Sequence, residues 1–355
     1  MLDMLLRWYR RRFTDPQAVA LLIILVVGFG VIYFFHNILA PLLVALVLAY
    51  LLEWPTSKLQ STGLSRGLAV GGVLIMFGGI TALAALVVMP AAWQQGVNLL
   101  TDLPKMLNQF HDFAATLPAR YPALMDAGIV DLMAENLRTR MMGFAESVVK
   151  YSMASLVGLF TLAIYLILVP LMVFFLLKDK KQMIYAFRRI LPRNRGLAGK
   201  VWIEMNQQIT NYIRGKVVEI VIVGVATYLV FWAMDLRYSL LLAVLVGISV
   251  VIPYIGAVIV TIPVFIVALF QWGVGPDFWT LFMAYLVVQG LDSNILVPFL
   301  FSEAVNLHPL VIILSVVIFG GLWGFWGVFF AIPLATLVKA VIHVWPDDLI
   351  AENLD

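Results

Sequence analysis

Apolar segments long enough to cross a lipid bilayer recur along most of the chain, between residues 18 and 343. A transmembrane helix needs about 20 predominantly apolar residues, and most of these segments contain no charged residue. The chain has 355 residues, of which 63% are hydrophobic and 12% are charged. One soluble core could not bury that much apolar surface. The sequence therefore predicts an all-α, polytopic helical membrane protein.

The order of apolar and polar stretches divides the chain into successive regions. Residues 1–92 contain three predicted spans, and the first two form a hairpin with a corner at His36-Asn37. In residues 93–151, apolar side chains recur at helical spacing, which indicates short amphipathic helices outside the membrane. The remaining regions are a fourth span, a basic loop with an interfacial helix, a transport core and a tail, at 152–177, 178–216, 217–345 and 346–355.

The distribution of Lys and Arg predicts the orientation of the chain. Residues 178–216 are rich in both and contain few acidic residues, which is typical of a cytoplasmic loop. Counting crossings from this loop places both termini and residues 53–66 in the cytoplasm, and residues 94–150 outside. An amphipathic helix at 198–215 is expected to lie along the membrane surface.

Two later regions share an interrupted design, in which two short apolar segments flank a turn rich in proline or glycine. Each segment is too short for a comfortable crossing. The first region is 238–270, interrupted at Pro253 and Gly256, and the second is 310–345, interrupted at Gly324 and Gly327. The sequence thus predicts two broken or re-entrant helical hairpins.

The two hairpins are also alike in their surroundings. Each carries an Ile-Pro step, Ile262-Pro263 or Ile332-Pro333, and each follows a longer predicted span. An odd number of crossings separates equivalent points, so the two units form an inverted repeat whether the hairpins re-enter or fully span. Inverted repeats with broken helices are typical of secondary transporters. The alternative is that Gly and Pro merely allow close helix packing.

One polar cluster lies inside an otherwise apolar span, and it consists of Gln289, Asp292, Ser293 and Asn294. A carboxylate at such a depth costs several kcal/mol unless it is solvated, protonated or paired. Asp292 is therefore a candidate proton carrier, cation ligand or solute-binding group. The competing interpretation is a structural hydrogen-bond node between helices.

Other charged residues are weaker candidates for ion coupling or mark the membrane interface: Arg214, Glu219 and Glu303. Arg214 and Lys216 lie close enough along a helix to hold Glu219 in an interfacial ion pair. Cysteine is absent, the 4 histidines lack zinc-binding spacing, and no Walker or hydrolase motif is present. We therefore expect no catalytic residues, no metal and no cofactor. The basic residues indicate membrane orientation rather than a nucleic-acid partner.

Several motifs resemble the autoinducer-2 exporter family. They are Asn211-Tyr212-Ile213-Arg214-Gly215-Lys216, Ile252-Pro253-Tyr254-Ile255-Gly256, Asp292-Ser293-Asn294 and the region from His308 to Pro333. The resemblance implies a bacterial inner-membrane protein, a pentameric homo-oligomer and export of small solutes such as autoinducer-2, with sodium/proton antiport in some relatives. It also places Asp292 where the family has acidic or amide residues, with Asn294 beside it.

The leading hypothesis is a secondary transporter or exporter that moves a small solute across the lipid bilayer. The solute would be autoinducer-2-like or another small polar metabolite, with protons or sodium as candidate coupling ions. A passive channel is the nearest alternative. A different class of function is a non-transporting membrane scaffold, which would recruit partners through residues 94–150 or the basic segment 178–216.

Overall fold

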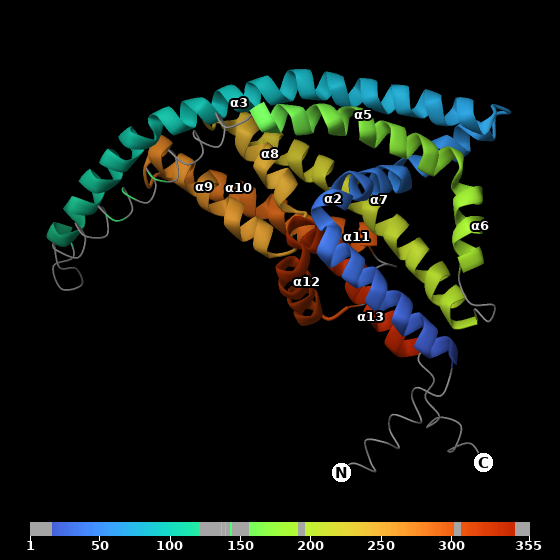
Figure 1. Ribbon diagram of the computed structural model, residues 1–355. Helices are drawn as coiled ribbons and strands as arrows, with labels where there is room; N and C mark the ends of the chain where they lie inside the picture. Colours follow the sequence, from blue (N-terminus) through green and yellow to red (C-terminus); the bar gives the residue numbers. More distant parts are fainter. Residues whose placement is uncertain are drawn as a thin grey trace, which may run out of the picture.

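The computed structural model describes residues 16–120, 156–190, 196–301 and 307–344, together with Asn136, Thr139 and Gly143. The regular structure of these residues is helical, with no strand among them (Figure 1). Seven of the described helices are long and apolar enough to cross a membrane. Many of their large apolar side chains face outward, as Ile75 and Phe299 do. The all-α, polytopic membrane fold is therefore confirmed.

The first helix, α2 (Pro16–Gln60), is continuous where a hairpin was predicted. Its backbone stays helical through His36-Asn37, so that step makes no corner. Figure 1 shows the helix bending along its length, and Pro41 cannot donate the backbone hydrogen bond expected at its position. The two ends of α2 both lie near the basic segment 178–216, because Leu25 packs near Val201 and Glu53 pairs with Lys180. The chain thus returns through a bent helix rather than through a turn.

The third predicted span does not end near residue 92. It belongs to α3 (Arg66–Arg120), a 55-residue helix that forms the long arc at the top of Figure 1. The prediction of short separate helices beyond Gln94 was therefore wrong as far as Arg120, because the helix continues through Pro104. Most of the rest of that predicted external region lies outside the described residues.

The fourth predicted span corresponds to α5 (Leu156–Lys178), which is followed by the short α6 (Lys180–Ile190). The next helix, α7 (Gly196–Ala233), joins the predicted interfacial helix and the fifth span in one rod of 38 residues. The apolar stripe that suggested a surface helix is instead core, because Val201 and Met205 pack with side chains of α2 and α13. The prediction that 198–215 is a separate interfacial helix was wrong.

Both predicted hairpins are interrupted. The first consists of α8 (Ser239–Ser249) and α9 (Ile255–Trp272), and the second of α12 (Pro309–Phe329) and α13 (Ala331–Val344). Between them lie α10 (Pro276–Leu291), the π-helix η1 (Asp292–Leu296) and α11 (Val297–Phe301). The first break is the turn between α8 and α9. In the second, Gly324 leaves helical geometry inside α12 with φ 59°, and Phe330 separates α12 from α13. The opposite orientation of the two units stays a prediction.

The limbs of each hairpin approach each other at a glycine. A Cβ added to Gly256 would overlap the carbonyl oxygen of Ser249, and one added to Gly327 would overlap the carbonyl oxygen of Phe319. Each contact joins the second limb to the backbone at or near the end of the first. Glycine is therefore required at both positions because any side chain would push the two limbs apart.

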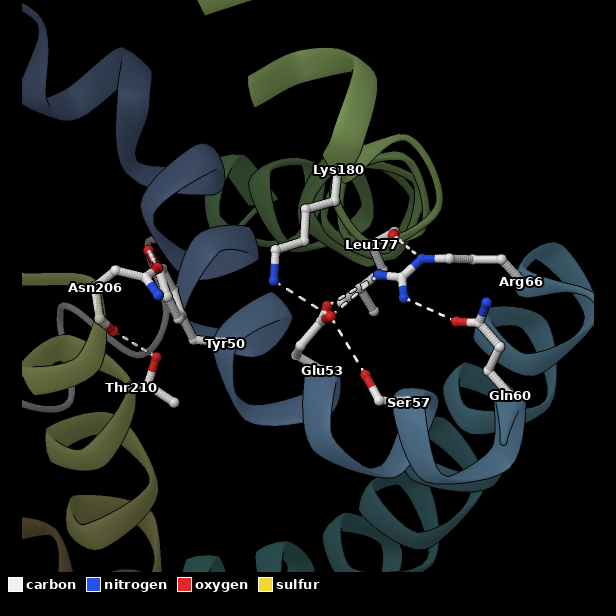
Figure 2. Close-up of polar contacts among 9 residues, drawn as sticks. All are labelled: Tyr50, Glu53, Ser57, Gln60, Arg66, Leu177, Lys180, Asn206 and Thr210. Carbon is white, nitrogen blue, oxygen red and sulfur yellow. Dashed lines mark hydrogen bonds and ion pairs between the residues drawn. The ribbon is translucent and has the colours of Figure 1, made fainter. Parts of the chain in front are cut away.

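Glu53 forms ion pairs with two basic side chains where α2, α3, α5 and α6 meet (Figure 2). Its carboxylate lies 3.1 Å from the Arg66 guanidinium and 3.2 Å from the Lys180 ammonium. Arg66 Nε also donates to the carbonyl of Leu177 at 2.8 Å, near the end of α5. The segments 53–66 and 178–181, which were both predicted to be cytoplasmic, thus lie at one end of the helices.

A second polar contact joins α3 to the hairpin of α8 and α9. The hydroxyl of Tyr238 donates to Asp102 Oδ2 at 2.6 Å, and the backbone N–H of Leu241 donates to Gln95 Oε1 at 2.9 Å. Burial, together with the neighbouring Asp102 carboxylate, raises the pKa of Tyr238 to about 12. Tyr238 therefore remains a hydrogen-bond donor at physiological pH and ties the extended part of α3 to α8.

We expect Gly256→Ala and Gly327→Ala to destabilise the protein, because each added methyl group collides with a backbone carbonyl. Overpacking of this kind costs about 1–3 kcal/mol or more. Gly321→Ala is the matched control, since a Cβ there has open space around it. Thermal unfolding of the purified variants in detergent measures the effect. Melting temperatures equal to that of Gly321→Ala would show that the close approaches are not required.

Candidate functional site

Helix α7 supplies hydrogen-bond donors to both hairpin breaks. Val250 caps the end of α8, so its carbonyl is one of the groups that a helix end leaves unpaired. Phe329 lies four residues before Pro333, which has no N–H to donate. Lys216 Nζ donates to the Val250 carbonyl at 2.9 Å, and Tyr212 OH donates to the Phe329 carbonyl at 2.9 Å. These donors lie one turn apart on α7, so one helix satisfies both breaks.

The ammonium of Lys216 has a charged partner and two aromatic neighbours in addition to the Val250 carbonyl. Its Nζ lies 2.7 Å from Glu219 Oε2, and the two side chains are 4% and 3% exposed. The rings of Phe301 and Tyr212 lie 5.2 Å and 5.9 Å from the ammonium, within range of a cation–π interaction. The expected ion pair of Glu219 is therefore present, and both of its side chains are buried among the helices.

Asp292 adds a second carboxylate to this region. It begins the π-helix η1, and its side chain is buried. Its Oδ1 atom has no hydrogen-bond partner among the described residues, and the carboxylate lies within electrostatic range of Lys216 and Glu219. One ammonium thus pairs with one carboxylate and lies within electrostatic range of a second. Single π-helical turns inside α-helices are frequent at functional sites.

The other predicted members of the polar cluster do not all join Asp292. Gln289 is half-buried, and its Nε2 atom is buried without a hydrogen-bond partner among the described residues. Ser293 and Asn294 are exposed, and Asn294 Nδ2 donates to the carbonyl of Gly290 at 2.9 Å. The cluster therefore divides into a buried part and an exposed part. The transport role predicted for all four residues stays a prediction.

The remaining candidates have different surroundings. Pro253 and Gly256 shape the first break, and Gly324 and Gly327 shape the second. Arg214 is half-buried, with its Nε atom lacking a hydrogen-bond partner among the described residues. Glu303 lies outside the described residues. No group of residues suited to holding a metal ion occurs in the described parts of the chain.

Tyr212, Phe301 and Phe329 were not singled out as site residues, and Lys216 was considered only as a partner of Glu219. A sequence signal existed for two of these residues. Pro333 predicts an unpaired carbonyl four residues earlier, and a lysine in an apolar helix predicts a buried partner. The identity of the donor to each break required the three-dimensional structure.

Removing the Tyr212 hydroxyl should destabilise the second break. In Tyr212→Phe the Phe329 carbonyl loses its donor, and an unsatisfied buried group costs about 1–3 kcal/mol. Tyr228→Phe, at a partly buried position of the same helix, is the control. Denaturant unfolding of both variants measures the difference. Equal stability of the two variants would contradict a structural role for this hydrogen bond.

Removing the Lys216 ammonium should be more damaging. Lys216→Met leaves Glu219 buried without its counter-ion, for which the cost is about 3–5 kcal/mol. The double variant Lys216→Met with Glu219→Gln removes the unpaired charge, so we expect it to recover part of the loss. Unfolding free energies of the two single variants and the double variant test this coupling. Strict additivity would mean that the pair does not interact.

Comparisons with known proteins identify the family of the chain. Residues 22–347 match the model of the AI-2E family transporter. The chain is 71% identical over 353 residues to "Putative permease PerM" of Escherichia coli (strain K12), covering 99% of this chain and 100% of that protein. It is 26% identical over 317 residues to "Putative transport protein YueF" of Bacillus subtilis (strain 168), covering 87% and 84%. The chain therefore belongs to the AI-2E family of membrane transporters.

Proposed function

We propose that this protein is a secondary transporter or exporter of a small polar solute in a bacterial inner membrane, and that Asp292 takes part in transport. The observation that carries the proposal is the cluster of Lys216, Glu219 and Asp292 beside the first hairpin break. Lys216 balances one carboxylate. The second requires a proton, a cation or a polar solute, because an uncompensated buried charge is costly.

The position of the cluster supports a transport role rather than a purely structural one. The Lys216 ammonium binds the carbonyl that ends α8 and also neutralises Glu219. A change in the charge of Asp292 would therefore act on the group that holds the first break. In secondary transporters, broken helices of this kind contribute to solute and ion sites and move during alternating access.

The family fits this proposal but leaves the solute open. The names of the two relatives describe a permease and a transport protein. Autoinducer-2-like compounds and other small polar metabolites are the candidates we propose to test, with protons and sodium as coupling ions. A passive channel would use the same polar cluster without coupling, so the flux experiment must separate the two mechanisms.

We expect Asp292→Asn to reduce solute flux into proteoliposomes by roughly tenfold or more, the loss that corresponds to about 1.4 kcal/mol in the rate-limiting step. The assay uses candidate solutes under imposed proton or sodium gradients. Asp277→Asn is the matched control, because Asp277 is an exposed carboxylate in the first turn of the same helical segment. Unchanged flux and unchanged pH dependence in Asp292→Asn would remove Asp292 from the mechanism.

The same vesicles distinguish the competing functions. A secondary transporter gives saturable flux that is stimulated by solute on the opposite side, whereas a channel gives neither behaviour. A scaffold gives no flux with any solute in the wild-type protein or the variants, and that result would overturn the proposal.

A further inference from the structure

Helix α6 is attached to the rest of the molecule mainly at its beginning. A single residue, Asp179, separates it from the end of α5, and it turns away from the direction of α5 and runs along an edge of the molecule (Figure 1). Its side-chain anchor is Lys180, whose Nζ lies 3.2 Å from Glu53 Oε1 (Figure 2). Beyond that turn, the side chain of Met183 is 48% exposed and that of Tyr185 is 73% exposed.

The sequence of α6 has a strong amphipathic pattern. Its 11 residues include Lys180, Lys181, Arg188 and Arg189 and contain no acidic residue. Met183, Ile184 and the apolar positions 187 and 190 fall on one helical face, which Lys180 shares in the first turn. Lys181, Tyr185 and Arg189 recur every fourth residue on another face. An apolar stripe bordered by basic residues is the pattern of a helix lying at an anionic membrane surface.

The residues around α6 also combine basic groups with apolar and aromatic side chains. The apolar helix α5 ends at Lys178, so the first residues of α6 must lie near the end of a membrane-spanning helix. Two further ammonium groups of this region pack on aromatic rings, Lys58 at 5.2 Å from Trp54 and Lys178 at 5.5 Å from Phe174. Aromatic and basic residues together are typical of the headgroup region.

We propose that α6 is an anionic-lipid-binding helix. Its apolar face lies at the boundary between headgroups and acyl chains, and its basic residues bind the phosphates of acidic phospholipids. Because the helix has basic residues and no carboxylate, its charge is complementary to acidic phospholipids, whereas a basic partner surface would be repelled. The Lys180–Glu53 ion pair holds the start of the helix at the ends of α2 and α3. This inference depends on the membrane topology and not on the transported solute.

The full chain contains no cysteine, so Met183→Cys and Tyr185→Cys each provide one site for a spin label. The protein is placed in nanodiscs of phosphatidylcholine alone or mixed with phosphatidylglycerol. We expect the label at 183 in the mixed discs to collide more with oxygen than with a water-soluble nickel chelate, and the label at 185 to show the reverse. Collisions dominated by nickel at both positions would overturn the proposal.

The role of charge is tested with Lys181→Gln, Arg188→Gln and Arg189→Gln combined with Met183→Cys. We expect this variant to lose the preference for oxygen in mixed discs, whereas Lys105→Gln, which removes an 82% exposed ammonium on α3, should retain it. Equal oxygen preference with and without phosphatidylglycerol would contradict specificity for anionic lipid. Spin–spin broadening at 183 would instead indicate a second copy of the chain and would also overturn the proposal.

Discussion

Two hydrogen bonds from α7 make the broken helices tolerable. A backbone carbonyl without a partner costs several kcal/mol in an apolar environment, so irregular backbone at membrane depth must find donors within the protein. Lys216 supplies the donor for Val250 and Tyr212 supplies it for Phe329. The packing of the helices depends on these two hydrogen bonds, because α7 must run past both breaks. The two limbs of each hairpin must also pack closely, which requires glycine at their contacts.

The structural and functional parts of the site share one group. The Lys216 ammonium completes the backbone of the first break, neutralises Glu219 and lies in the field of Asp292. The two aromatic rings around it limit access of water and strengthen these electrostatic interactions. Any change in the charge of Asp292 therefore alters the electrostatic environment of Lys216, whose hydrogen bond completes the backbone of the first break.

Local features of the sequence were sufficient for the membrane fold and for the positions of the breaks. Apolar length predicts spans, and Pro253 and Gly324 mark where helical geometry fails. Continuity was harder to predict, because His36-Asn37 has a polar character typical of a turn yet remains helical within α2. The hydrogen-bond donors to the breaks could not be predicted from the sequence, since Tyr212 and Phe329 are 117 residues apart in the chain. The spacing of Ser293 and Asn294 could not reveal that both are exposed.

The two hairpins use the same solution with different chemistry, and this makes them inequivalent. The hydroxyl of Tyr212 is neutral, so its hydrogen bond to Phe329 involves no charged donor, although the Tyr212 ring itself contacts the Lys216 ammonium. The donor to Val250 is an ammonium whose position is shared with Glu219, so that contact responds to charge. Protonation or ion binding at Asp292 would thus act more directly on the α8–α9 break, whose donor is charged, than on the α12–α13 break, whose donor is neutral. In the proposed transport cycle, we therefore expect the first hairpin to respond more strongly to the coupling ion than the second.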